Sequence, residues 1–319
     1  MAGTETARRM NHLVTPERFN EAAYLQENRD IAHAVKIGQF KSGLDHYEQF
    51  GHSEVRFQRG APDDLASLKV NKLARIGQIV REDMPVVRTD LSFDFLTPEL
   101  RSQFNIIDTD VISSNEYDDD VLALIDKHQD GLVLDCGAGS RSTYYQNVVN
   151  FEIAAYPSTD VRGVGEKLPF KDHSFDAVVS VAVLEHVKDP WACANEILRV
   201  LKPGGDLMVC VPFLQPLHGY PHHYYNMSGQ GLRNLFGDAI EVRRHEVPYS
   251  VTPIWTLTWI LQSWADGLRG STLDEFKKMR VSDFLDGALP HIDKHFVTEL
   301  SQEKNMELAS ATVIHAVKV

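Results

Sequence analysis

The chain has 319 residues, 43% hydrophobic and 24% charged, a composition typical of a folded globular protein with room for two domains. Its formal net charge of −13 at pH 7 argues against nucleic acid as a partner, because binding to a phosphate backbone depends on basic patches. The sequence shows no membrane-length apolar run and no apolar signal segment near its start, so we expect a cytoplasmic protein without a membrane partner. Its three cysteines show no metal-ligand spacing, so we expect free thiols.

The first 60 residues are predicted to form a small helical module. Residues 1–16 are polar, whereas residues 17–57 place Tyr24, Ile31 and Val35 where two or three short helices would share a core. The text FNEAAYLQENRDIAHAV, followed by LDHYEQFG, resembles a short module found beside bacterial glycosyltransferases and other envelope-related enzymes. The resemblance implies a structural or docking role for this module.

Residues 61–115 are predicted to form one helix followed by a linker. Apolar residues recur at helical spacing within 63–83, namely at Leu65, Leu68, Leu73, Ile76 and Val80. Pro85 ends this helix, because the residue before a proline disfavours the helical conformation. Residues 86–115 have mixed polarity and no clear period, so we expect a linker or a partial lid there.

Residues 116–319 alternate between strand and helix signals, which predicts a parallel sheet with crossover helices. The predicted elements are a helix at 116–129, strands at 132–136, 148–153, 161–164 and 176–181, a helix at 189–201, a strand at 206–212, a helix near 228–236, and strands at 239–246 and 309–317. An insertion at about 253–305 contains an apolar helix with Trp255, Trp259 and Trp264. This helix is a cap over a substrate site, a dimer interface or a packing helix.

The most informative stretch is VLDCGAGS at residues 133–140. A buried strand that ends in Asp-x-Gly-x-Gly turns sharply, and its glycines let a ligand approach the backbone. The motifs LPF at 168–170, SFDAVVS at 174–180, VLEHV at 183–187 and RVLKPGG at 199–205 follow. Together they resemble the class I S-adenosylmethionine-dependent methyltransferases, in the branch that acts on small molecules. The resemblance covers residues 116–252 and 308–319.

The resemblance implies an α/β, Rossmann-like fold with a mostly parallel sheet whose last strand is antiparallel, and S-adenosylmethionine as the cofactor. It assigns Asp135 to the cofactor's amino-acid end and Glu152 to its ribose diol. The expected cofactor-binding residues are Asp135, Cys136, Gly137, Ala138, Gly139, Arg141, Glu152, Gly165, Glu166 and Val181.

Two positions depart from the family pattern. Arg141 stands where a third glycine is usual, and it either pairs with the cofactor's carboxylate or is a surface arginine. Val164 stands where an acidic residue usually contacts adenine, so this contact has to come from the backbone, from Glu166 or from Asp160.

Two neighbouring crossovers are shorter than the family pattern. The stretch SRSTYYQNVV can supply one or two helical turns at most, and AAYPSTD is too short for a crossover helix. We expect Tyr144, Tyr145 and Tyr156 to line the adenosine pocket. The shortened crossovers also leave room for residues 17–83 to pack there.

Candidate catalytic residues come from two segments. His186 in VLEHV follows a strand end that faces the ligand crevice, and it is either a base or a structural histidine. The loop after residue 212 adds His218, His222, His223 and Tyr224, which we expect to cover the acceptor, with one histidine accepting a proton. The spacing of these three histidines fits no tight zinc pattern, so we predict no metal.

The leading hypothesis is a methyltransferase that acts on a small molecule by O- or N-methylation, including a sugar or natural-product intermediate. One alternative is an enzyme of this fold repurposed for a non-methylating reaction such as cyclisation or elimination. Another alternative is a non-enzymatic partner protein. A homodimer through the Trp-rich insertion is one expected assembly.

Overall fold

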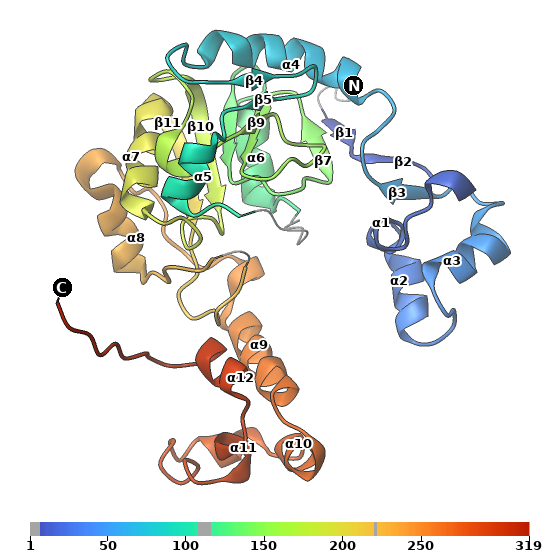
Figure 1. The fold of residues 1–319 in the computed structure, drawn as a ribbon, viewed down its shortest axis with the longest axis vertical. Helices are drawn as coiled ribbons and strands as arrows, with labels where there is room; N and C mark the ends of the chain where they lie inside the picture. Colours follow the sequence, from blue (N-terminus) through green and yellow to red (C-terminus); the bar gives the residue numbers. More distant parts are fainter. Residues whose placement is uncertain (1–6, 108–115, 220–221, 319) are drawn as a thin grey trace.

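The computed structural model describes residues 7–107, 116–219 and 222–318 (Figure 1). Its centre is a seven-stranded sheet with the order β11-β10-β6-β8-β9-β5-β4. Five predicted strands are present: β6 (Val133–Cys136), β8 (Val148–Glu152), β9 (Val161–Arg162), β10 (Phe175–Val181) and β11 (Leu201–Cys210). They pair in parallel, as the strand and helix alternation predicts.

Both faces of this sheet are buried, because successive side chains of each strand point to opposite sides. On one face, Val133 and Val148 pack against Val121 of α6 (Asp119–Lys127). On the other face, Leu134 and Val149 belong to a larger core that includes α4 (Leu65–Ile79) and α7 (Pro190–Val200). The result is a three-layer α/β arrangement, which agrees with the predicted Rossmann-like class.

Helix α4 covers the face of the sheet where the crossovers are short. Its Leu73 and Ile76 pack in the core with Phe151 and Phe170. The stretch expected to contain a helical turn is extended instead, as β7 (Thr143–Tyr145), and pairs antiparallel with β1 (Ala7–Arg9). Tyr144 is consequently buried beneath α4, with its hydroxyl 2.5 Å from Asp160, and does not line an adenosine pocket. The period-two pattern of a three-residue strand is too short to recognise in sequence.

The amino-terminal residues beyond β1 form a small unit of their own. It contains a two-stranded ladder of β2 (Asn11–Leu13) and β3 (Phe57–Arg59), and the helices α1 (Glu21–Glu27), α2 (Arg29–Lys36) and α3 (Gly43–His46), the last continuing as a π-helical turn over Tyr47–Gly51. Tyr24, Ile31 and Tyr47 are its buried centre. In Figure 1 this unit lies to one side of the main sheet.

Residues 86–107 differ from the predicted linker. They contribute β4 (Val87–Arg88) and β5 (Phe93–Asp94) to the sheet edge beside β9, and then α5 (Pro98–Phe104). Strands of two residues leave no readable period in the sequence, and only an available edge at β9 defines them. The rest of the predicted linker, residues 108–115, lies outside the described residues.

The two predicted strands at 239–246 and 309–317 are wrong within the described residues, where the sheet ends at β11. After α8 (Gly229–Phe236), Arg244 pairs with Asp120 of α6 at 2.7 Å rather than extending the sheet. The sheet is therefore mostly parallel, as predicted, but its antiparallel strand is β4 at the opposite edge and not the last strand. An apolar alternation permits pairing, but pairing also needs the segment to reach an open edge.

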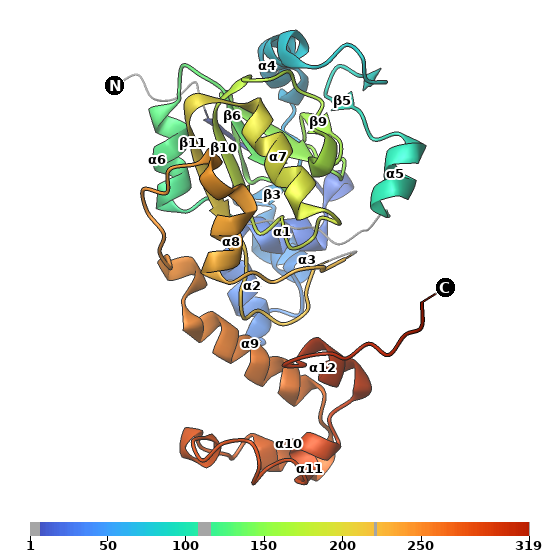
Figure 2. The same ribbon diagram turned by 90° about the vertical axis from the view of Figure 1, so that its left-hand side faces the viewer.

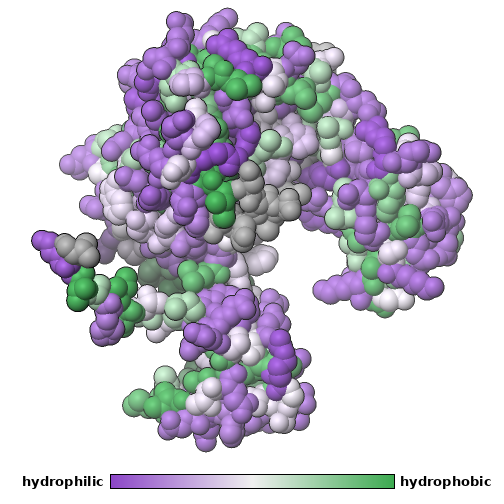
Figure 3. All heavy atoms as spheres, in the orientation of Figure 1, coloured by the Kyte–Doolittle hydropathy of each residue, from purple (hydrophilic) through white to green (hydrophobic). Residues whose placement is uncertain are grey.

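The insertion forms an arm that leads the chain away from the sheet (Figure 2). The arm consists of α9 (Pro253–Asp266), α10 (Gly270–Phe276), α11 (His295–Thr298) and α12 (Gln302–Glu307), with Leu268, Phe276 and Phe296 in a separate core. The tail beyond it is exposed, with Ile314 at 88%, and shows apolar side chains at its surface in Figure 3. Among the described helices, none combines the length and hydropathy needed to cross a membrane.

Candidate functional site

The functional candidates gather in one part of a cleft of about 1970 Å³. This cleft runs from the carboxyl ends of β6, β8 and β10 along the whole of β11 and past residues 239–248. Ligands bind at the carboxyl ends of the strands in open α/β sheets. Eight of the ten predicted cofactor residues line this cleft: Cys136, Gly137, Ala138, Arg141, Glu152, Gly165, Glu166 and Val181. Asp135 and Gly139 do not line it.

The turn after β6 depends on Gly137. This residue has φ +87°, and a Cβ built there would lie 2.3 Å from Cγ2 of Val183, in the loop after β10. Gly139 also has a positive φ of +62°. Gly137 therefore requires glycine and Gly139 favours it, and the close approach of Gly137 to Val183 brings the β6 and β10 loops together.

Glu152 ends β8 beside this turn. One carboxylate oxygen accepts the backbone N–H of Gly139 at 2.8 Å, and the other accepts that of Ile153 at 2.8 Å. Burial raises the pKa of Glu152, and these backbone donors act in the opposite direction. Oε1 also accepts the Ala154 N–H at 3.4 Å, so Oε2 is the oxygen that keeps a second lone pair for a ligand in the cleft.

Asp135 and Arg141 form a buried pair. Arg141 is only 7% exposed, and its Nε and Nη2 both lie 2.8 Å from Oδ2 of Asp135. The Tyr117 hydroxyl donates to the same oxygen, and its ring stacks on the Arg141 guanidinium at 4.1 Å. Arg141 is therefore not the surface arginine that the sequence left open, and Asp135 lies behind the cleft wall. Sequence reasoning missed Tyr117, although it opens the predicted 116–129 helix.

Gly165 and Glu166 occupy the part of the cleft next to α7. A Cβ on Gly165 would lie 2.7 Å from Sγ of Cys193, so this backbone also needs glycine. Glu166 accepts the backbone N–H groups of Lys188 and Asp189 at 3.0 and 3.3 Å, which fixes the loop before α7. Burial raises the pKa of Glu166. Val164 is fully buried and offers no polar side chain.

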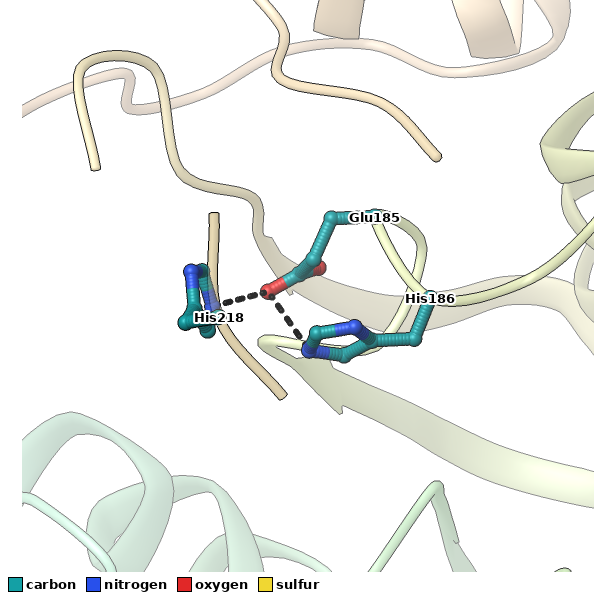
Figure 4. A group of neighbouring side chains, drawn as sticks. All are labelled: Glu185, His186 and His218. Carbon is teal, nitrogen blue, oxygen red and sulfur yellow. Dashed lines mark ion pairs between the residues drawn. The ribbon is translucent and has the colours of Figure 1, made fainter. Parts of the chain in front are cut away.

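His186 and His218 converge on Glu185, which follows β10 (Figure 4). Nδ1 of His186 lies 2.7 Å from the carbonyl of His222, and Nδ1 of His218 lies 2.8 Å from that of Pro216. A carbonyl only accepts, so each neutral ring carries its proton on Nδ1 and leaves a lone pair on Nε2. Burial lowers the pKa of His186 to about 4 and lowers that of His218.

The remaining loop candidates separate. His222 lies on the cleft, with Nε2 bonded to Asn105, the C-cap residue of α5. His223 accepts the backbone N–H of His218 on Nδ1 and bonds Asn226 through Nε2, so both of its nitrogens are in use. Neither His223 nor Tyr224 lines the cleft; the backbone N–H of Tyr224 donates to the Glu185 carbonyl at 2.7 Å. Side chains of successive loop residues point in different directions, so His222 faces the cleft while His223 and Tyr224 do not. The spacing of these residues in the sequence does not reveal this difference.

Helix α9 forms the opposite side of the cleft. Thr256, Trp259 and Ile260 line it, and the Trp259 ring lies 5.1 Å from that of His218. Trp255 and Leu261 on the same helix are exposed. The Trp-rich helix therefore borders the site with part of its apolar surface and leaves the rest uncovered in the single chain.

Glu185 is the functional candidate absent from the predicted residue set. It has no exposed surface, and burial raises its pKa to about 8. The sequence signal was its position in VLEHV directly after a strand that ends at the ligand edge. Its two histidine neighbours come from separate segments, so spacing could not show the group.

Comparison with known proteins agrees with this geometry. Residues 134–209 match the family model described as a methyltransferase domain. An uncharacterized methyltransferase of Mycobacterium sp. (strain KMS) is 56% identical over 45 residues, covering 14% of this chain and 18% of that protein. One of Mycobacterium leprae (strain Br4923) is 53% identical over 86 residues, covering 27% and 29%. The chain thus spans less than a third of the length of these two relatives.

Among solved structures, a methyltransferase of Thermotoga maritima described as a possible histamine N-methyltransferase is 21% identical, with a TM-score of 0.26. The match covers 37% of this chain and 69% of that chain. Together with the family match and the parallel sheet, the cleft residues support one conclusion about this part of the chain. Residues 134–209 are similar to a methyltransferase domain, and the strands they contribute belong to a mostly parallel, Rossmann-like sheet.

Proposed function

We propose that this protein transfers a methyl group from S-adenosylmethionine to a small molecule, by O- or N-methylation. The observation that carries the proposal is the position of Glu152, a half-buried carboxylate on the cleft that is held by Gly139 at the turn after β6. Two adjacent carboxylate oxygens suit the two hydroxyls of a ribose, as in dinucleotide-binding folds.

The other cleft residues fit the remaining parts of this cofactor. Asp135 lies behind the cleft wall, so its contribution would be to hold Arg141, whose Nε and Nη2 it pairs with. The Arg141 guanidinium lies on the cleft and provides positive charge for a carboxylate. The cofactor, when bound, supplies an activated methyl group, so the protein's main contribution is to position the acceptor.

The acceptor would occupy the part of the cleft between His186, His218 and α9. Thr256, Trp259 and Ile260 of α9 line the cleft together with both histidines. The resemblance of the amino-terminal module to one found beside glycosyltransferases favours a sugar or polysaccharide intermediate. Burial lowers the pKa values of both histidines, which favours neutral rings beside the acceptor.

Titration calorimetry with S-adenosylmethionine and S-adenosylhomocysteine tests the proposal. The full chain should bind both ligands in the micromolar range, and Glu152→Ala should weaken binding by roughly 10–100-fold, the equivalent of about 1.5–3 kcal/mol for hydrogen bonds to a charged group. The matched control is Glu82→Ala, an exposed carboxylate at the end of α4, which should bind like the wild type. Absence of binding in the folded wild-type chain would contradict the proposal.

A second candidate is a non-methylating reaction on the same fold. Val164 favours it, since this fully buried apolar residue stands where the family usually contacts adenine through an acid. The two candidates separate in an acceptor screen with isotopically labelled methyl donor. Labelled product supports methyl transfer, whereas conversion of the acceptor without label supports the second candidate.

A further inference from the structure

Glu185 is a carboxylate without a partner. Its side chain has no exposed surface, and neither oxygen receives a hydrogen bond from the described residues. Buried polar groups are almost always satisfied, because leaving one unpaired costs free energy. Two buried carboxylate oxygens without donors therefore need an explanation.

The two ring nitrogens nearest to Glu185 do not satisfy its carboxyl oxygens. Nε2 of His186 lies 3.8 Å from its Oε1, and Nε2 of His218 lies 3.9 Å from the same oxygen. These distances are too long for hydrogen bonds. Because both rings carry their proton on Nδ1, each directs a lone pair towards the carboxylate (Figure 4). One carboxyl oxygen and two ring nitrogens thus surround a single point without a hydrogen bond between them.

A cation at that point resolves the arrangement. Nitrogen and oxygen ligands lie ~2.0–2.2 Å from zinc, so two ligands of one ion are up to ~4.4 Å apart. The observed separations of 3.8 and 3.9 Å fall within this limit. Histidine ligands of metals characteristically donate their other N–H to a carbonyl or carboxylate, which fixes the ring. His186 and His218 both do so, through the carbonyls of His222 and Pro216.

We propose that Glu185, His186 and His218 form a binding site for a divalent cation of the zinc class. Two imidazoles and a carboxylate are donors that borderline first-row ions prefer. Three protein ligands leave at least one coordination position, and both histidines line the cleft, so the open position faces the ligand space. The site goes beyond the proposed methyl transfer, and its existence does not depend on that activity.

The sequence did not show this group because it joins two segments. Within the loop, a metal site would have to use His218, His222 and His223. Of these three, only His218 lies beside Glu185 and His186. His222 bonds Asn105, and both nitrogens of His223 are engaged. Folding of the loop over the end of β10 brings His218 to Glu185.

The test is titration of the chelator-treated full chain with Zn²⁺ by calorimetry and with Co²⁺ by visible absorption, in the absence of S-adenosylmethionine. We expect one tight site per chain and a tetrahedral or five-coordinate Co²⁺ spectrum. Glu185→Gln and His218→Ala should each reduce Zn²⁺ affinity by more than the roughly 10–100-fold caused by loss of an outer partner of a metal ligand. The matched control is His222→Ala, because only the backbone carbonyl of His222 contacts His186.

The outcomes separate the metal site from a merely structural Glu185. Zn²⁺ should raise the midpoint of thermal unfolding of the wild type and of His222→Ala, but not that of Glu185→Gln, because a ligand that binds only the folded state stabilises it. Equal Zn²⁺ affinity in the wild type and in Glu185→Gln would overturn the proposal and leave Glu185 as a buried neutral acid. Equal loss in His222→Ala would also overturn it. Failure to bind S-adenosylmethionine would not affect either result.

Discussion

The ion cluster beneath α4 leads to a quantitative prediction. Asp160 has no exposed surface, and its oxygens accept the Tyr144 hydroxyl at 2.5 Å and the Asn150 backbone N–H at 2.9 Å. Nζ of Lys72 lies 2.6 Å from one oxygen, and Nζ of Lys69 lies 3.6 Å from the other. One carboxylate therefore balances two buried ammonium groups and joins α4 to the loop before β9.

Substitution Asp160→Asn keeps the shape of the side chain and removes its charge. It leaves both ammonium groups buried without a counter-ion. Removal of one partner of a buried ion pair costs about 3–5 kcal/mol. Such a loss is a large part of the ~5–15 kcal/mol that stabilises a typical protein. At ~2–4 °C per kcal/mol, the unfolding midpoint should fall by roughly 6–20 °C.

Urea denaturation and calorimetry measure this change, with the exposed Asp130→Asn as a control that should stay within about 0.5 kcal/mol of the wild type. Addition of Lys72→Met to Asp160→Asn removes one of the stranded ammonium groups. The double variant should therefore recover part of the loss, with a coupling energy of about 1–3 kcal/mol. A loss below about 1 kcal/mol in Asp160→Asn, or strictly additive effects, would refute the reasoning.

Three further predictions concern Lys72, Gly137 and Tyr24. Burial lowers the pKa of Lys72 from 10.5 to about 8, so the unfolded state binds more protons than the folded state between pH 8 and 10.5. The free energy of unfolding should therefore rise with pH by up to about 3 kcal/mol across this window. Urea titrations at several pH values should show that Lys72→Met loses this rise. Gly137→Ala places a Cβ 2.3 Å from Val183 and should abolish ligand binding in calorimetry. Addition of Val183→Ala to this variant should restore binding only in part, because the left-handed backbone at residue 137 still costs about 1–2 kcal/mol. Tyr24→Phe removes the buried hydroxyl that lies 3.0 Å from Nδ1 of His46, and it should destabilise the amino-terminal unit by about 1–2 kcal/mol. Hydrogen exchange should show reduced protection of the amides in this unit. An unchanged exchange pattern would contradict the role of this hydrogen bond.

Local sequence patterns were sufficient for the central part of this protein. The apolar runs of β6, β8 and β10 are buried on both faces, and such runs identify strands of a parallel sheet without knowledge of their partners. The glycine turn at Gly137 was predictable for a related reason, because it directly follows a strand end, and the carboxyl ends of parallel strands meet at one edge of the sheet. The role of Glu152 was assigned by the resemblance alone and stays a prediction.

Other features depended on contacts between distant segments. Lys69 and Lys72 lie on the apolar face of α4, but only the position of Asp160 explains how that face buries two charges. Likewise, His186 and His218 acquire their relation to Glu185 only when the loop after β11 folds across the end of β10.

The sheet edges show the same division most clearly. The sequence by itself determined which segments can be strands in the middle of the sheet, because burial on two faces leaves a continuous apolar run. It did not determine the edges, where the two-residue strands β4 and β5 form beside β9 while the alternating segment at 309–317 remains unpaired within the described structure. An edge strand needs a partner with free backbone groups within reach, and the path of the helical arm α9–α12, a property of the tertiary structure, decides which segment reaches one.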